Sequence, residues 1–233
     1  MATVSKPART TPPVRLSFAN QLWVPKAGDN GVWYSVALMF DKNSSADKAF
    51  LKDLRADYEA VLAEQWPDES KRPRIPFIGG PIKDGDVALN KSGIPLKEKY
   101  PDYAGHWIMS VGTSDQPPIV GREMVADGTG QMALRRITDS NEVYSGCLAK
   151  VNVNAYARTR QDNPGGSFGL NGVQKWEEGE RIGGGRAAVG DMFEGEESAT
   201  GADNPANYGA SDDPFAGTAA SSATATAEAD PFA

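Results

Sequence analysis

Residues 143–158, VYSGCLAKVNVNAYAR, decide the fold class, because small apolar side chains alternate with polar ones along this stretch. Successive side chains of a β-strand point to opposite faces, so a period of two predicts a long strand, which we place from Glu142 to Arg158. One face of this strand is small and mostly apolar, and it would pack into a core through Val143, Ser145, Cys147, Ala149, Val151, Val153, Ala155 and Ala157.

The opposite face of the same strand mixes aromatic, amide and cationic side chains, and it consists of Tyr144, Gly146, Leu148, Lys150, Asn152, Asn154, Tyr156 and Arg158. Aromatic rings that stack on bases and cations that follow phosphates are what binding of a nucleic-acid single strand needs. A solvated sheet face that carries two tyrosines is the alternative interpretation, and this strand alone does not decide between the two.

Further strand patterns lie on both sides of this segment. Residues 14–24 end at Pro25 and, after a turn at 27–31, residues 32–41 form a second strand, so the pair is predicted to be a hairpin. Shorter strand patterns follow at 106–111, within 117–137 and at 167–176, whereas residues 67–105 are rich in Pro, Gly and Lys and are predicted to be irregular.

One segment has helical periodicity instead. Ser44 is a helix-capping residue, Pro67 marks the end, and the apolar stripe between them predicts core packing through Phe50, Leu54, Tyr58, Val61 and Leu62. About six strands with one inserted helix predict a mainly β fold, an OB-fold-like small barrel.

The charge is divided unevenly along the chain. All 24 Lys and Arg lie at or before Arg186, while nine acidic residues and no basic ones follow from Asp191 onward. Residues 1–190 therefore hold the other 22 of the 31 acidic residues and carry a net charge of +2. Such asymmetry is typical of a nucleic-acid binder with an interaction tail. From about Gly195 the composition is mostly Ala, Gly, Ser, Thr, Asp, Glu, Asn and Pro, and residues 216–229 have no large apolar side chain. Such a segment cannot bury enough surface to offset the entropy of ordering, which predicts disorder over 195–233.

We therefore expect a flexible arm at residues 1–13, a folded domain at 14–193 and a disordered acidic tail at 194–233. The chain has one cysteine, Cys147, and one histidine, His106, so these residue types cannot build a zinc site. No phosphate-binding glycine motif is present, and Asp84 and Asp86 lack a regular carboxylate partner for a magnesium site. We expect no enzymatic activity, no cofactor, no metal and no membrane span.

Other aromatic and basic residues extend the candidate DNA-binding set. A small barrel cannot bury all of its aromatic side chains, and some of them lie close to cations. With the strand face, the expected DNA-binding residues are Trp23, Lys26, Trp33, Arg72, Arg74, Trp107, Tyr144, Lys150, Asn152, Asn154, Tyr156 and Arg158. Because stacking and phosphate contacts tolerate any base, we expect binding without sequence preference.

The acidic tail repeats a short motif. Residues 212–216 read DDPFA and residues 230–233 read DPFA, so an acidic stretch ends twice in an aromatic residue. Acidic charge can steer such a peptide to a partner while the phenylalanine fills a pocket. The expected partner-binding residues are Asp213, Pro214, Phe215, Asp230, Pro231 and Phe232, and the tip resembles the acidic tails of bacterial single-stranded DNA-binding proteins.

Several segments together resemble one family of phage-encoded single-stranded DNA-binding proteins with an OB-type core. They are residues 15–18 (RLSF), 22–26 (LWVPK), 34–38 (YSVAL), 82–86 (IKDGD), 105–108 (GHWI), 143–147 (VYSGC), 151–154 (VNVN) and 168–175 (FGLNGVQK), followed by 183–185 and 191–193. The resemblance spans roughly residues 14–193 in order.

This resemblance implies a role in phage DNA replication or recombination in the cytoplasm of the infected bacterial host. It also implies a binding groove across the barrel and an acidic tail that contacts replication proteins and competes with DNA. Single-stranded DNA is the expected partner and duplex DNA a second candidate. Two alternatives remain open: an OB-like adaptor that binds protein partners, and a protein that anneals complementary DNA strands.

Overall fold

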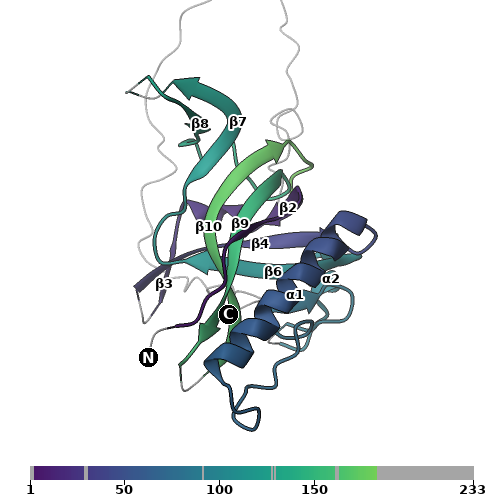
Figure 1. The fold of residues 1–233 in the computed structure, drawn as a ribbon. Helices are drawn as coiled ribbons and strands as arrows, with labels where there is room; N and C mark the ends of the chain where they lie inside the picture. The colour runs from purple at the N-terminus through teal and green to yellow at the C-terminus, as the bar shows by residue number, and fades with distance from the viewer. Residues whose placement is uncertain are drawn as a thin grey trace, which may run out of the picture. The chain divides into compact units, whose positions relative to one another are not determined.

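The computed structural model describes residues 3–182 except 29, 30, 91, 127, 129, 161 and 162. Within these residues the chain is mainly β (Figure 1), with strands β1 Arg9–Thr10, β2 Val14–Ser17, β3 Lys26–Gly28, β4 Gly31–Asp41, β5 Ile82–Asp84, β6 His106–Thr113, β7 Ile119–Ala126, β8 Met132–Arg136, β9 Leu148–Arg158 and β10 Gly165–Glu177. The helices are α1 Ser45–Gln65, the single turn α2 Leu96–Lys99, and the 3₁₀ turns Ala19–Leu22 and Pro101–Tyr103.

Five strands close into a barrel. Neighbouring strands pair in the order β9, β2, β4, β6 and β10, and β10 pairs back with β9. The β6–β10 pair is parallel, with Gly169 opposite Gly112, while β9 and β10 are antiparallel over their whole length. This connectivity matches the five strands of an OB-fold, and the predicted fold class is confirmed.

The alternation along β9 is confirmed in the closed barrel. Ala149, Val151, Val153, Ala155 and Ala157 are buried inside it, and the intervening side chains are partly exposed on the outer face. The strand begins at Leu148, however, and not at Glu142. Gly146 takes a φ of 110°, which L side chains rarely adopt, and donates its backbone N–H to Leu16 O, so the chain turns there.

Helix α1 forms as the sequence predicts. The Ser44 hydroxyl accepts a hydrogen bond from the Asp47 backbone N–H, which caps the first turn. Leu54, Tyr58 and Val61 are buried against the barrel. Tyr58 packs against Phe168 of β10 and against Phe77, with ring centroids 6.0 and 5.6 Å away.

The segment at 14–24 differs from the single strand that we expected. Strand β2 ends at Ser17 because Phe18 has a φ of 56°, in the left-handed region, and a 3₁₀ turn follows directly. The predicted antiparallel pairing with residues 32–41 is present, with Leu16 opposite Leu38.

Residues 67–105 contain more regular structure than the composition predicts, namely β5, α2 and a 3₁₀ turn. This segment covers part of the outer face of β4 and β6 and forms a second core with it, made of Ala37, Met39, Leu96, Tyr103 and Ile108. Lys42 ties the segment to the barrel through ion pairs with Asp84 and Asp86.

The N-terminal residues, which we expected to form a flexible arm, instead lie beside β9 and α1. Arg9 of β1 pairs with Val153, and its guanidinium forms an ion pair with Asp57 of α1. Lys6 forms an ion pair with Glu64. Backbone pairing with β9 and two ion pairs with α1 therefore hold the N-terminal residues in place, although these residues have few apolar side chains.

The β7–β8 hairpin is the most exposed part of the described sheet and extends beyond the barrel (Figure 1). Met124, Val125, Met132 and Leu134 lie on it with large exposed fractions. Among the described residues, no helix combines the length and the apolar character that a membrane crossing requires.

Candidate nucleic-acid interface

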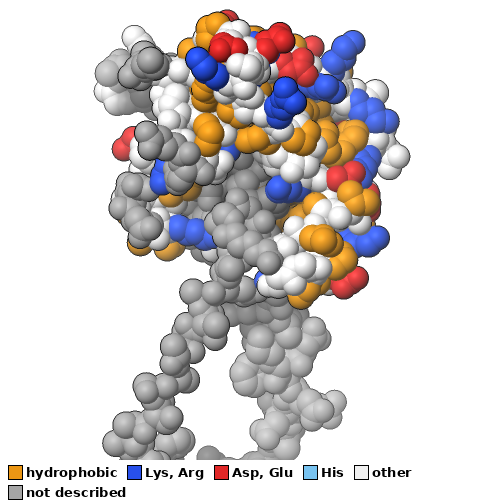
Figure 2. Space-filling model, turned by 90° about the horizontal axis from the view of Figure 1, so that it is seen from below, with side chains coloured by type: hydrophobic (Ala, Val, Ile, Leu, Met, Phe, Trp, Pro, Cys, Tyr) orange, Lys and Arg blue, Asp and Glu red, His pale blue; other side chains and the backbone are white. Residues whose placement is uncertain are grey.

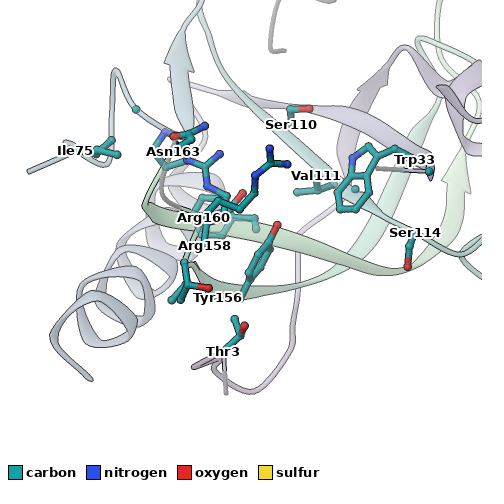
Figure 3. Close-up of a pocket in the computed structure, with 18 of the residues that line it drawn as sticks. Thr3, Trp33, Ile75, Ser110, Val111, Ser114, Tyr156, Arg158, Arg160 and Asn163 are labelled. Atoms are coloured by element: carbon teal, nitrogen blue, oxygen red, sulfur yellow. Dashed lines mark hydrogen bonds between the residues drawn. The ribbon is translucent and has the colours of Figure 1, made fainter. Parts of the chain in front are cut away.

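An open pocket of about 930 Å³ lies across the barrel, between β4 and β6 on one side and the end of β9 on the other (Figure 3). In an OB-fold, the face of strands two and three and the loops after strands one and four bind oligonucleotides. Here these elements are β4, β6, the loop that contains β3, and the β9–β10 connection. The residues that line the pocket include Trp33, Ile75, Lys83, Ser110, Gly112, Tyr156, Arg158, Arg160, Asn163 and Ser167.

The floor of this pocket is built from small residues. Ser110 and Gly112 of β6 and Ser167 of β10 line it. A Cβ atom at Gly112 would lie 2.3 Å from Trp33 Nε1, so the indole ring rests directly against the glycine backbone. A glycine inside a strand commonly marks such a close approach. The small floor leaves room for a flat group between the aromatic side chains.

Two aromatic side chains flank the floor. Trp33 at the start of β4 is 44% exposed, and Tyr156 lies on the outer face of β9. Figure 3 shows Trp33 at one side of the pocket and Tyr156 at the other, beside Arg158 and Arg160. Rings with an accessible face are suited to stacking on planar groups such as nucleobases.

The cations of the pocket include one with an unsatisfied donor. Arg158 Nε is buried without a hydrogen-bond partner, while its Nη2 donates to Asn163 Oδ1 at 3.2 Å. A buried donor without an acceptor costs free energy, so a movement of the Arg158 side chain that brings this N–H to an anionic group such as phosphate would be favourable. Lys83 Nζ donates a weak hydrogen bond to Gly79 O at 3.4 Å and also lines the pocket.

Four of the other predicted aromatic and basic residues have structural contacts near the barrel. Trp23 and Trp107 are partly buried against the main core, with Trp107 also under Lys42 Nζ at 6.0 Å. Lys26 pairs with Trp33 across β3–β4, so it lies beside the pocket without lining it. Arg72 donates its Nε–H to Trp66 O.

Tyr144 does not share a face with Tyr156, because residues 143–147 belong to a turn. Its hydroxyl donates to Glu178 Oε2 at 2.6 Å, and Arg181 lies over its ring at 3.8 Å. The hydrogen bond with the Glu178 carboxylate raises the pKa of the Tyr144 phenol above its ordinary value. This tyrosine therefore fastens the segment after β10 to the barrel.

The rest of the predicted set continues along β9, away from the pocket, or lies next to it. Asn152 and Asn154 accept hydrogen bonds from the Asn171 amide at 3.1 and 3.2 Å. Lys150 lies farther along, over the Trp176 ring. Arg74 is exposed and immediately precedes Ile75, which lines the pocket.

The residues expected from the sequence to bind DNA did not include Lys83 or Gly112, which line the pocket together with Arg160. Lys83 comes from the segment expected to be irregular, and no pattern placed that segment against β6. Gly112 offered a signal, since an isolated glycine within a strand indicates a bulge or a close approach. The predicted partner-binding residues of the tail, from Asp213 to Phe232, lie outside the described residues.

Figure 2 shows a face on which Lys and Arg side chains lie among exposed hydrophobic ones. The described part of the chain holds no cluster of three or more His, Cys, Asp or Glu side chains that could bind a metal ion. What the pocket offers is stacking surface and positive charge, which suits an anionic polymer with flat groups.

The fold is similar to that of two solved structures. The single-stranded DNA-binding protein from bacteriophage Enc34 in complex with ssDNA is 19% identical, with a TM-score of 0.56, and the match covers 76% of this chain and 89% of that one. Another structure of the Enc34 protein is 18% identical with a TM-score of 0.54, covering 82% of this chain and 99% of that one. At this identity the likeness shows a shared fold.

A comparison with curated proteins finds no match. The family described as the ssDNA-binding protein of Enterobacter phage Enc34 matches residues 8–203, which is most of the sequence. The match includes the whole barrel and all of the pocket-lining strands. The chain therefore belongs to the family of the Enterobacter phage Enc34 ssDNA-binding protein.

Proposed function

We propose that this protein coats single-stranded DNA without sequence preference and supports phage DNA replication and recombination in the cytoplasm of the infected bacterium. One observation carries the proposal. In the pocket at the oligonucleotide-binding position of an OB-fold, Trp33 and Tyr156 flank a floor of small residues beside Arg158, whose Nε–H is buried without an acceptor. Family membership and the ssDNA complex of the Enc34 protein support it.

The mechanism follows from the pocket's side chains. Bases stack on Trp33 and Tyr156, and each stack contributes about 1–3 kcal/mol. The glycine and serine floor lets the bases lie flat, and stacking accepts every base because each has a π-face. Arg158, Arg160 and Lys83 contact the phosphates. Affinity should therefore fall steeply with salt as counterions are released.

The acidic residues at 194–233 have a second role in this proposal. The repeated Asp-Pro-Phe motif recruits replication proteins, and the acidic charge competes with DNA phosphates for the basic pocket. Deletion of 195–233 removes seven acidic residues and no basic ones. We expect this deletion to tighten DNA binding at low salt. Unchanged or weaker binding would contradict the competition.

The decisive experiment is fluorescence anisotropy with labelled oligo-dT over a salt series. The full chain should bind with a steep salt slope, and a Trp33→Ala/Tyr156→Ala variant should lose affinity while it keeps its circular dichroism spectrum. Arg55→Gln on the exposed face of α1 is the control for a general change of charge. If a chain without residues 195–233 also fails to bind at low salt, the result favours an adaptor that binds protein partners. The alternative of a protein that anneals complementary DNA strands is tested by an annealing assay.

A further inference from the structure

A second cluster of aromatic and basic residues lies at the other end of β9–β10. The Trp176 ring has Lys150 Nζ at 3.6 Å from its centroid and the Arg122 guanidinium carbon at 4.1 Å. Arg122 Nη1 also donates to Trp176 O at 3.4 Å. We call Arg122, Lys150 and Trp176 the Trp176 cluster. It brings together three strands, since Arg122 lies on β7, Lys150 on β9 and Trp176 on β10.

The two cations of this cluster differ from the nearby Arg135 and Lys175. Arg135 forms ion pairs with Glu123 and Glu142, and Lys175 forms one with Glu178. Among the residues that the structure describes, no carboxylate forms an ion pair with Lys150 or Arg122. The aromatic ring fixes the positions of both charges while it leaves them without an anion. Positive charge arranged in this way is suited to bind phosphate.

The Trp176 cluster lies on the same outer face as the pocket. Tyr156, Asn154, Asn152 and Lys150 alternate with buried residues along β9, so their side chains share its outer face. Lys150 is opposite Gln174 of β10, and Tyr156 is opposite Ser167, which lines the pocket. The strands β9 and β10 run side by side from one end to the other (Figure 1).

The stretch between the two sites is polar and uncharged. The Asn171 amide donates to the side-chain oxygens of Asn152 and Asn154, and Asn152 donates to Thr10 Oγ1. No carboxylate occurs among these residues to repel a phosphate chain. Trp176 lies nine positions after Ser167 on β10, so the two are at most about 30 Å apart at the usual rise of about 3.3 Å per residue.

We propose that the Trp176 cluster is a second phosphate-binding subsite, where DNA that leaves the pocket along β9–β10 is held by Lys150 and Arg122. This inference rests on the proposed function and adds the path of the strand to it. Bases do not stack on Trp176 in this arrangement, because the cations occupy its ring. Trp176 is a positioning residue, and Lys150 and Arg122 contact the phosphates. The subsite is therefore filled only by a strand long enough to reach it.

Strand length provides the test. The probes are labelled oligo-dT of about 5 and about 16 nucleotides, near the two ends of the range of site sizes known for OB-folds. The full chain is compared with Arg122→Gln/Lys150→Gln and with the matched control Lys52→Gln/Arg55→Gln, which removes the same charge from exposed positions on α1. With the long probe, the slope of log affinity against log salt should become shallower by about 1.4 relative to the control, since each lost contact removes about 0.7.

With the short probe, the variant and the control should have the same slope and affinity. If Arg122→Gln/Lys150→Gln and the control have equal salt slopes with the long probe, the subsite is overturned. It is also overturned if Arg122→Gln/Lys150→Gln loses the same affinity with the short probe as with the long one, because the loss then reflects only the lower positive charge of the whole protein. A difference that disappears when residues 195–233 are deleted would assign the cluster to the acidic tail and also overturn it. If the unaltered chain binds neither probe at low salt, the proposed function itself fails.

Discussion

The pocket and the Trp176 cluster contain the same kinds of residue in opposite arrangements. In the pocket, no cation lies over Trp33 or Tyr156 among the described residues, and Arg158 keeps a donor without an acceptor. In the cluster, Lys150 and Arg122 lie on the ring of Trp176. Accessible rings can receive bases, whereas a ring covered by cations can only present their charge. What a tryptophan contributes to binding therefore depends on what already covers its face.

We expect the largest loss of DNA affinity when both aromatic rings of the pocket are removed, which tests directly whether accessible rings stack on bases. In the Trp33→Ala/Tyr156→Ala variant two stacks are lost, each contributing about 1–3 kcal/mol, so Kd should rise at least about 30-fold. Anisotropy with oligo-dT measures the change, and thermal unfolding shows whether the barrel is intact. A folded variant with wild-type affinity would show that bases do not stack in the pocket.

A change in the floor tests the same site without removing a ring. In Gly112→Ala, the new Cβ would meet Trp33 Nε1 at 2.3 Å and the Tyr34 backbone oxygen at 2.7 Å, so both the indole and the neighbouring β4 backbone must shift. Loss of one stack predicts a Kd about 5- to 160-fold higher. Gly128→Ala is the matched control, because its Cβ would meet no atom within 4 Å. Wild-type binding by a folded Gly112→Ala chain would mean that the placement of Trp33 is unimportant.

Replacing Arg158, which is partly exposed but has a buried Nε, should have an effect about as large as the loss of one stack, and this effect should depend on salt. In Arg158→Gln, loss of a charge-assisted hydrogen bond costs about 1.5–3 kcal/mol, and the salt slope should become shallower by about 0.7. Titration at several salt concentrations measures both quantities against Arg55→Gln. An affinity loss that is independent of salt would indicate a structural role for Arg158 and not a phosphate contact.

The smallest effect on DNA binding is expected at Tyr144. In Tyr144→Phe, the hydroxyl bonds with Glu178 and Gly179 are lost. The free energy of unfolding should fall by about 0.5–1.5 kcal/mol, as measured by urea denaturation, while Kd for oligo-dT stays within about twofold. A large loss of affinity at unchanged stability would return Tyr144 to the DNA-binding set.

The contrast between Tyr144 and Tyr156 also shows what the sequence could predict. Alternation identified the two faces of β9 and the core residues correctly, because the period of two follows from strand geometry. Alternation alone did not reveal where the strand begins. Gly146 turns the chain there, and the carbonyl of Glu180 lies where its Cβ would be. That contact joins residues 34 positions apart, so only the tertiary structure shows it.

Helix α1 and the closed barrel were predictable because caps, apolar stripes and strand patterns are local. Lys83 was not, since it enters the pocket through the pairing of β5 with β6. Trp23 and Trp107 carried the same composition signal as Trp33, yet they pack against the core. Residue type indicated the chemistry of the site, while the placement of each ring depended on long-range packing.

The distance in sequence between Trp33 and Tyr156 has a consequence for synthesis of the chain. The barrel closes only when β10, the last strand, pairs with both β6 and β9, which brings Gly169 opposite Gly112 and Asn154. Contacts of such large sequence separation form slowly, because a long loop must close before they are made. A nascent chain that has not yet extended through β10 lacks a closed barrel and the Ser167 side of the pocket. The ability to bind DNA should therefore appear late in folding, and its onset reports the moment of barrel closure.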